Sequence, residues 1–301
     1  NADALSVVNV FGGYPCAVRT ADWHDGQLAA YVPPDSVVDI RRPEFAFLGE
    51  GHGRIRARRL RGVMSMGLLV SAPPGSKVGD DVAEALGVTH YEPPLAMVMD
   101  SDNGPAPKGY RPEYDVDSLR RYPGAFVDGE LVHVTEKIHG ASARYCWHDD
   151  QMFAGSHRNW KKYDARNLWW QPLYLHPEVD YFCREHPEFT VYAEVYGQVQ
   201  DLKYGVFSGV RIAVFDLLRA GVWVDALDAR RLGTILPWVP LIFSEMPYRF
   251  ADICALADGP SLVPGADHLR EGVVVKPLVE RQCLEVGRLN LKVVSADYLA
   301  R

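Results

Sequence analysis

Short apolar or alternating stretches dominate the first third of the chain, and residues that favour turns separate them. The stretches cover residues 7–18, 28–32 and 55–70, with breaks such as Gly12-Gly13 and Pro33-Pro34-Asp35-Ser36. Alternation of apolar and polar positions places one face of a strand in a core. The pattern predicts a compact barrel or sandwich of short strands, with one short helix over residues 80–86.

A segment rich in proline and glycine follows at residues 92–112. It contains five prolines and two glycines, namely Pro93, Pro94, Pro105, Pro107, Pro112, Gly104 and Gly109. Such segments commonly connect domains. We therefore expect a boundary near residue 105, with one domain over residues 1–105 and a second over residues 106–301.

Strand and helix patterns alternate irregularly in the second part. The predicted strands are 131–136, 191–196, 211–217, 272–276 and 289–294, and the predicted helices are 119–122, 179–186 and 226–235. A doubly wound sheet requires a helix after each strand. Because that regularity is missing, the pattern indicates an α+β fold.

Composition narrows the class of protein. Hydrophobic residues make up 48% of the chain and charged residues 24%, as in a globular protein with a sizeable core. No apolar run approaches the roughly 18 residues that span a bilayer. Five widely spaced cysteines without a CxxC pair argue against a zinc ribbon or a disulfide framework, and favour a reducing, cytoplasmic setting. The net charge of -7 leaves nucleic-acid binding to a local basic surface.

The first candidate for chemistry is Lys137, which ends an apolar strand and precedes Gly140 by three positions. A strand end fixes the lysine backbone while its long side chain reaches into a cleft, and the glycine permits a close approach. Alone, the pattern equally describes an exposed lysine before a turn.

Three further patterns carry charged residues on apolar strands. Glu194 lies within Val191-Tyr192-Ala193-Glu194-Val195, Glu271 and Lys276 bracket three valines, and Lys292 shares a strand face with Asn290. A half-buried carboxylate needs a partner, which is either an ion pair or a metal. Each pattern alone is also typical of an ordinary strand with charged ends.

In combination and in this order, the four patterns resemble motifs I, III, IV and V of the covalent nucleotidyltransferases. That superfamily comprises ATP- and NAD-dependent ligases and mRNA capping enzymes. Val214-Phe215-Asp216 resembles the intervening motif whose aromatic residue stacks on the base. Gly155-Ser156-His157-Arg158 resembles the segment whose arginine contacts the nucleotide.

The detailed resemblance is to RNA ligases. Glu136-Lys137-Ile138-His139-Gly140 is similar to the nick-sealing phage type, whereas DNA ligases and capping enzymes usually carry aspartate where His139 stands. Stretches 45–48, 56–62 and 86–91 resemble a smaller family of RNA ligases. The resemblance implies an N-terminal OB-fold β-barrel over residues 1–105, followed by an antiparallel-sheet nucleotidyltransferase domain over residues 106–301.

The resemblance also implies site roles. Lys137 would be the catalytic nucleophile that carries AMP from ATP, and Glu194 and Glu271 would hold Mg²⁺ or Mn²⁺. Phe215 would stack on adenine and Glu136 would help to read its amine. The full set of implied nucleotide-binding residues is Glu136, Ile138, Gly140, Arg158, Phe215, Glu271, Lys276 and Lys292.

The implied enzyme is an ATP-dependent RNA ligase that joins 3′-OH and 5′-phosphate RNA ends through lysyl-AMP and RNA-adenylate. A nicked duplex is the expected partner, no membrane is involved, and a monomer is expected. One departure stands out, because the family's last motif usually has two lysines separated by one residue. Here Lys292 is flanked two positions away by Asn290 and Val294.

Other interpretations stay open from the sequence. A DNA ligase or an mRNA capping guanylyltransferase would share the lysine chemistry, but His139 and the domain order speak against both. A catalytically idle RNA-binding protein on a ligase fold has Asn290 and Val294 as its support. In the first domain, Arg54, Arg56, Arg58, Arg59 and Arg61 form a basic cluster that would either contact phosphates or protect a strand edge with charge.

Overall fold

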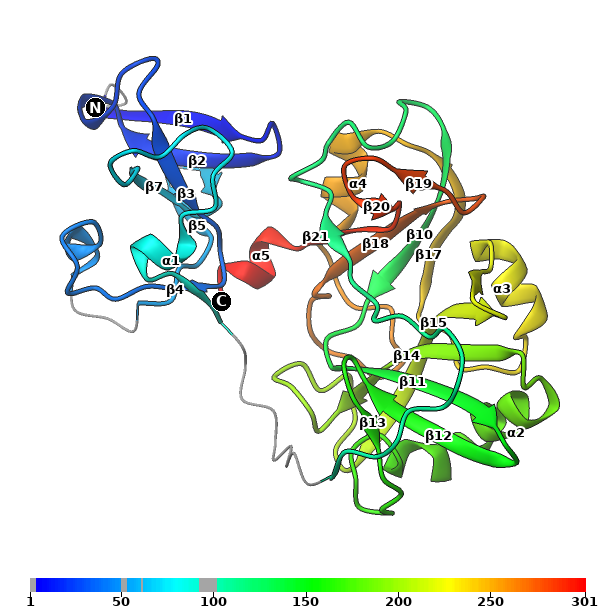
Figure 1. Cartoon of the computed structure of the whole chain (residues 1–301). Coiled ribbons are helices and arrows are strands. Elements are labelled where there is room, and N and C mark those ends of the chain that lie inside the picture. The colour runs from blue at the N-terminus through cyan, green and yellow to red at the C-terminus, as the bar shows by residue number, and fades with distance from the viewer. Residues whose placement is uncertain (1–3, 50–52, 61, 92–101) are drawn as a thin grey trace. The chain divides into compact units, whose positions relative to one another are not determined.

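A computed structural model of the protein describes residues 4–49, 53–60, 62–91 and 102–301. The chain divides into two compact units (Figure 1). The first unit comprises residues 1–93, 118–124 and 295–301, and the second comprises residues 94–117 and 125–294. Within the described ranges, no helix is long and apolar enough to cross a membrane.

The first unit is built from short antiparallel strand pairs, as the alternating pattern predicts. The pairs are β1 (Leu5–Val10) with β2 (Tyr14–Arg19), β3 (Ala29–Val32) with β7 (Leu68–Ser71), β4 (Ser36–Val37) with β8 (Thr89–His90), and β5 (Arg58–Leu60) with β6 (Val63–Ser65). Two short helices, α1 (Ala83–Leu86) and α5 (Ala296–Leu299), belong to the same unit. The described strands of this unit do not join into one closed barrel, so the OB fold remains a prediction.

Its core contains side chains from the β3–β7 pair, from α1 and from the segments between the strands, namely Ala30, Val32, Val38, Phe45, Ile55, Val70 and Leu86. The turn between β1 and β2 fixes where residues 118–124 pack. A Cβ on Gly13 would lie 2.0 Å from the Arg120 carbonyl oxygen, so only glycine allows this approach. The Tyr14 hydroxyl also donates to Ser118 Oγ at 2.6 Å.

The helix expected over residues 119–122 is absent, and this prediction was wrong. These residues form a turn in which the amides of Arg121 and Tyr122 donate to the carbonyls of Ser118 and Leu119. Pro123 and Gly124 follow at once, and Pro123 favours an extended residue before it. A helix therefore has no room to propagate beyond its first turn.

The second unit contains two antiparallel sheets, as the α+β pattern and the family resemblance imply. One has five strands in the order β17 (Leu241–Pro247), β10 (Leu131–Lys137), β18 (Gly272–Pro277), β21 (Leu291–Val294) and β9 (Asp117–Ser118). The other has six in the order β13 (Trp160–Lys161), β12 (Gln151–Ser156), β11 (Ala141–His148), β14 (Phe189–Gly197), β15 (Val210–Arg219) and β16 (Val222–Trp223). A small hairpin joins β19 (Gln282–Cys283) to β20 (Gly287–Arg288).

Helices α2 (Pro177–Glu185), α3 (Ala226–Leu232) and α4 (Phe250–Leu256) complete this unit. Helix α2 starts with a proline, which suits the first turn, and buries Val179, Phe182 and Cys183 on one face. That face packs on the six-stranded sheet (Figure 1), against buried residues such as Tyr145 and Val191. The resulting core holds both ends of β14 in place, and one of the candidate carboxylates lies on that strand.

Candidate active site

Strand β10 delivers the candidate nucleophile to a cavity. Its interior residues are buried and Lys137 is its last residue, so the backbone is fixed while the side chain extends beyond the sheet. Antiparallel pairing with β18 places Lys137 opposite Gly272. A Cβ on Gly272 would lie 2.1 Å from the Val293 carbonyl oxygen, so glycine is required for β18 to fit between β10 and β21.

The residue before Gly272 is Glu271, and it meets the lysine directly. Lys137 Nζ lies 2.9 Å from Glu271 Oε1 and 2.8 Å from Oε2. Burial by itself would lower the pKa of Lys137, but the charges of Glu271 and Glu194 outweigh it and raise that pKa. Burial would likewise raise the pKa of Glu271, but Lys137 and His139 together lower it to about 2. The amine is therefore held as an ammonium ion in this state.

A second carboxylate reaches the same place from the other sheet. Glu194 pairs with Ser142 across β14 and β11. Burial raises the pKa of Glu194 to about 7, and Lys137 offsets only part of this effect. A Cβ on Gly140 would lie 2.1 Å from the Val195 carbonyl oxygen and 3.1 Å from Glu194 Cγ. The glycine three positions after Lys137 thus lets the turn between β10 and β11 pack against β14, the strand that carries Glu194.

The cavity has a volume of about 610 Å³, within the range of small-molecule sites. Its lining includes seven of the residues singled out from the sequence, namely Glu136, Lys137, Ile138, Glu194, Phe215, Lys276 and Lys292. Arg158 is exposed in the turn after β12 and does not line the cavity, so its role stays a prediction. Asp115 and Asp117 also line it, and sequence patterns did not point to them.

The carboxylate of Glu136 is already engaged by its own chain. Its Oε1 accepts from the Ser261 hydroxyl and its Oε2 accepts from the Leu262 amide, both at 2.6 Å. Burial raises the pKa of Glu136, although the hydrogen bond from Ser261 works against this. Each oxygen retains a further lone pair, so a bound base would share this carboxylate with the Ser261 hydroxyl and the Leu262 amide.

Lys276 does not reach freely into the cavity. Its ammonium group contacts Asp216 Oδ2 at 2.6 Å and the Phe215 carbonyl oxygen at 3.1 Å. Arg288 contacts the same Asp216 oxygen at 2.7 Å and also pairs with Glu280. Burial would raise the pKa of Asp216, but Arg288 and Lys276 outweigh it and hold the pKa below its ordinary value. We call Asp216, Lys276, Arg288 and Glu280 the Asp216 cluster.

The Asp216 cluster accounts for the missing lysine in the last motif. Tyr114 donates to Asp216, and the Asn290 amide nitrogen donates to the Tyr114 hydroxyl, each at 2.6 Å. Asn290 is only 2% exposed. Two cations already balance two carboxylates in the cluster, so a lysine at position 290 would bury an extra positive charge beside it. Lys292 lines the cavity instead, and burial followed by the charge of Lys137 lowers its pKa.

His139 stands where aspartate is usual, and the structure gives it two acidic neighbours. His139 Nε2 lies 2.9 Å from Asp201 Oδ1, and Nδ1 lies 3.5 Å from Glu271 Oε2. Its backbone amide donates to the Tyr204 hydroxyl at 2.7 Å. Asp201 and Tyr204 both lie in the loop between β14 and β15, so this loop is attached directly to the nucleophile's turn.

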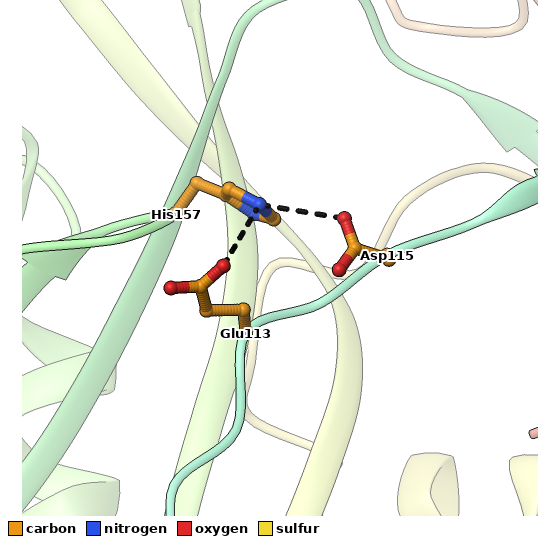
Figure 2. A group of neighbouring side chains, drawn as sticks. All are labelled: Glu113, Asp115 and His157. Atoms are coloured by element: carbon orange, nitrogen blue, oxygen red, sulfur yellow. Dashed lines mark ion pairs between the residues drawn. The ribbon is translucent and has the colours of Figure 1, made fainter.

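A group of possible metal ligands lies at the surface and shares Asp115 with the lining of the cavity. His157 Nε2 is 3.6 Å from Glu113 and 3.4 Å from Asp115, and the three side chains point toward one another (Figure 2). Their ligand atoms lie within 4.8 Å of one another, close enough for one ion. Sequence spacing gave no hint of this group because His157 comes from the turn after β12. Exposed acidic groups of this kind are common without an ion, and the two contacts account for the geometry as ion pairs.

Comparison with known proteins agrees with the geometry. The sequence model of the RNA ligase family matches residues 130–294, more than half of the chain. A Naegleria gruberi RNA ligase variant solved with ATP and Mn has a TM-score of 0.80 and 22% identity, covering 99% of this chain and 94% of that one. The same enzyme solved with PPi has a TM-score of 0.77 and 23% identity, covering 99% and 93%. At this identity the likeness shows the fold. A search of curated proteins found no significant match.

We predict that Asp216→Asn lowers the free energy of unfolding by about 3–5 kcal/mol, because it leaves the buried Lys276 ammonium without its carboxylate partner and Arg288 with Glu280 alone. Urea denaturation measures the change. Asp228→Asn is the matched control, since Asp228 and Arg231 form an exposed pair whose loss should cost about 1 kcal/mol at most. Equal effects in the two variants would contradict a stabilising role for the cluster.

Proposed function

Because the chain belongs to the RNA ligase family, we propose that it is an ATP-dependent RNA ligase with Lys137 as its nucleophile. The observation that carries the proposal is the placement of Lys137 Nζ in the cavity, 2.8 Å from Glu271 and facing the charge of Glu194. A lysine at a strand end, in a cavity of nucleotide size, beside two carboxylates is the arrangement that nucleotidyl transfer needs.

The proposed reaction has three displacements at phosphorus. Lys137 Nζ forms a bond to the α-phosphorus of ATP, pyrophosphate leaves, and the amine loses a proton. An oxygen of an RNA 5′-phosphate then attacks the same phosphorus and frees the lysine. Finally an RNA 3′-hydroxyl attacks that 5′-phosphate, loses its proton, and AMP leaves. Catalysis of such steps consists of alignment and charge neutralisation.

The carboxylates fit a divalent ion of the hard type. Glu194 and Glu271 offer oxygen ligands, which Mg²⁺ and Mn²⁺ prefer. Both side chains face one lysine. Burial raises the pKa of Glu194 to about 7 and Lys137 offsets only part of this effect, so a further cation beside Glu194 would favour its ionised form. When bound, the ion supplies charge neutralisation at the α-phosphate. The Naegleria enzyme has been solved with ATP and Mn and with AMP and Mn, which supports both cofactors here.

Lys137 must become neutral before it can attack. Glu271 currently raises its pKa, so this carboxylate has to turn away from the amine. Lys292 lies in the same cavity and its charge would then lower the pKa of Lys137. Phe215 lines the cavity with Tyr114 packed against it at 4.6 Å between ring centroids, so a base can stack on the supported ring.

Residues 1–105 are proposed to act as an OB domain that engages RNA, and residues 106–301 as the nucleotidyltransferase domain. Arg56 and Arg58 are exposed. Arg59 is exposed but pairs with Asp297 at 3.1 Å, and Arg54 is paired with Asp35. The remaining member of the arginine cluster, Arg61, lies outside the described residues. A nicked RNA duplex with 3′-OH and 5′-phosphate ends is the proposed substrate of a monomeric, cytoplasmic enzyme.

A DNA ligase, a capping guanylyltransferase and an idle RNA-binding protein are the alternatives. Retention of the Lys137–Glu271 pair argues against the idle protein, because a buried pair without function is costly to keep. Incubation with α-labelled GTP tests the capping enzyme, and sealing of nicked DNA beside nicked RNA tests the DNA ligase.

We predict that Lys137→Ala abolishes transfer of label from α-labelled ATP to the protein, with metal present and RNA absent. Gel analysis after acid denaturation measures the transfer. Lys162→Ala removes an exposed lysine of the same unit and should label as the wild type does. Persistent labelling of the alanine variant would identify a different nucleophile.

We predict that Glu194→Gln and Glu271→Gln each slow lysine adenylylation on the order of 10- to 100-fold at limiting metal. The amide keeps the size of the side chain and removes the negative charge. A titration of rate against Mn²⁺ concentration tests this, with Glu185→Gln at the exposed end of α2 as control. A wild-type metal dependence in either variant would remove that residue from the proposed metal site.

We predict that Lys292→Ala slows lysine adenylylation more than it slows sealing of RNA that is already adenylylated. Asn290 faces the Asp216 cluster, so Lys292 carries the phosphate contact of this strand. The two reactions are measured separately on one preparation. Equal losses in both would favour a structural role for Lys292.

A further inference from the structure

The loop between β14 and β15 joins the ends of two interior strands, and hydrogen bonds and close packing hold it firmly. The Gln198 amide donates to the Gly209 carbonyl at 3.0 Å, and the Val206 amide donates to the Lys203 carbonyl at 2.9 Å. Gly205 packs so closely that a Cβ would lie 2.3 Å from the Gly265 carbonyl oxygen. The loop is therefore braced at its base and along its length.

Tyr204 is the main anchor of the loop. It is 1% exposed, its amide donates to His268 Nε2 at 3.0 Å, and its hydroxyl accepts from the His139 amide at 2.7 Å. Leu202 is also buried, with 2% exposure. The side chains of Leu202 and Tyr204 are therefore packed inside the second unit.

The side chain of Phe207, by contrast, is exposed to solvent. It is 96% exposed, and it is the only large apolar side chain exposed within residues 198–209, which the structure describes completely. Its neighbours Ser208 and Gly209 are exposed and small. An aromatic ring left in water forgoes the burial that phenylalanine usually gains, and here the braced backbone keeps it there.

The first residues of the loop contact the turn that follows Lys137. Asp201 contacts His139 at 2.9 Å, and Gln200 Nε2 donates to the Gly140 carbonyl at 3.4 Å. Lys203 is exposed and adds a positive charge between this end of the loop and Phe207. The exposed ring and cation therefore belong to a segment that is tied directly to the reacting lysine.

We propose that Phe207 stacks on a base of the RNA whose end is being joined, while Lys203 contacts its backbone. This inference rests on the proposed function. Stacking needs only one open ring face and tolerates any base, which a single aromatic beside small residues provides. A protein partner would require a broader apolar surface around the ring. Within this loop Val199, Leu202 and Tyr204 are buried and Val206 is half-buried.

The test uses full-length protein with Phe207 changed to Ala, Leu and Tyr. The dissociation constant for a fluorescent nicked RNA duplex is measured by anisotropy without ATP, and lysine adenylylation is measured without RNA. Tyr181→Ala is the matched control, because Tyr181 is a 58% exposed aromatic on α2. Lys203→Ala is assayed at several salt concentrations.

We expect Phe207→Ala to weaken RNA binding at least about fivefold, Leu to weaken it partly, and Tyr to restore it. Adenylylation should remain as in the wild type for all three. Lys203→Ala should flatten the salt dependence by about one phosphate contact. Unchanged RNA binding in Phe207→Ala would overturn the proposal, as would wild-type protein that binds no RNA. A change confined to the oligomeric state in sedimentation would overturn it in favour of self-association.

The experiments test the ligase function and the stacking role of Phe207 independently. If wild-type protein binds RNA through Phe207 but does not label itself with ATP, the ligase function fails and the stacking role stands. If labelling is normal and Phe207 has no effect on RNA, the ligase function stands and the stacking role fails.

Discussion

The ion pair between Lys137 and Glu271 is the interaction on which the architecture of the second unit converges. A lysine and a carboxylate can share a buried cavity only as partners, because either charge alone would be expensive to desolvate. Their contact at 2.8 Å requires β10 and β18 to pair with Lys137 opposite Gly272. Gly272 and Gly140 then follow as requirements, since a side chain at either would collide with a neighbouring strand.

A second constraint acts on the other wall of the cavity. Asp216 follows Phe215 on β15, and its carboxylate contacts Lys276, Arg288 and Tyr114. This cluster fixes the strand that carries the supported aromatic ring. Asn290 joins the cluster through the Tyr114 hydroxyl, while its own Oδ1 is buried without a hydrogen-bond partner. In the last motif of this chain, Asn290 therefore contacts the Asp216 cluster through Tyr114, and Lys292 lines the cavity.

Sequence patterns predicted β10, β14, β15, β18 and β21 because buried strands appear as apolar runs. They missed β11, β12 and β17, which carry polar or exposed positions. The strand expected at 131–136 is β10 over Leu131–Lys137, and the strand expected at 272–276 is β18 over Gly272–Pro277. The helix at 119–122 failed because local propensity lost to a turn that ends in Pro123-Gly124. Sequence patterns did not predict roles for Arg288 and Tyr114. Both lie far from Asp216 in the sequence, and only the fold brings them into contact with it.

The charges of the cavity are balanced locally, in a chain whose net charge is -7. With no nucleotide bound, each buried cation needs an internal partner, and Glu271 provides one for Lys137 as Asp216 does for Lys276. The proposed reaction requires the first pair to open and the second to remain closed. The structure is arranged for this difference: Glu271 has His139 at 3.5 Å as an alternative partner, whereas Asp216 is held by three groups at once. Net charge is therefore a poor guide to this site, because the charges that matter are paired locally and only one pair is free to exchange.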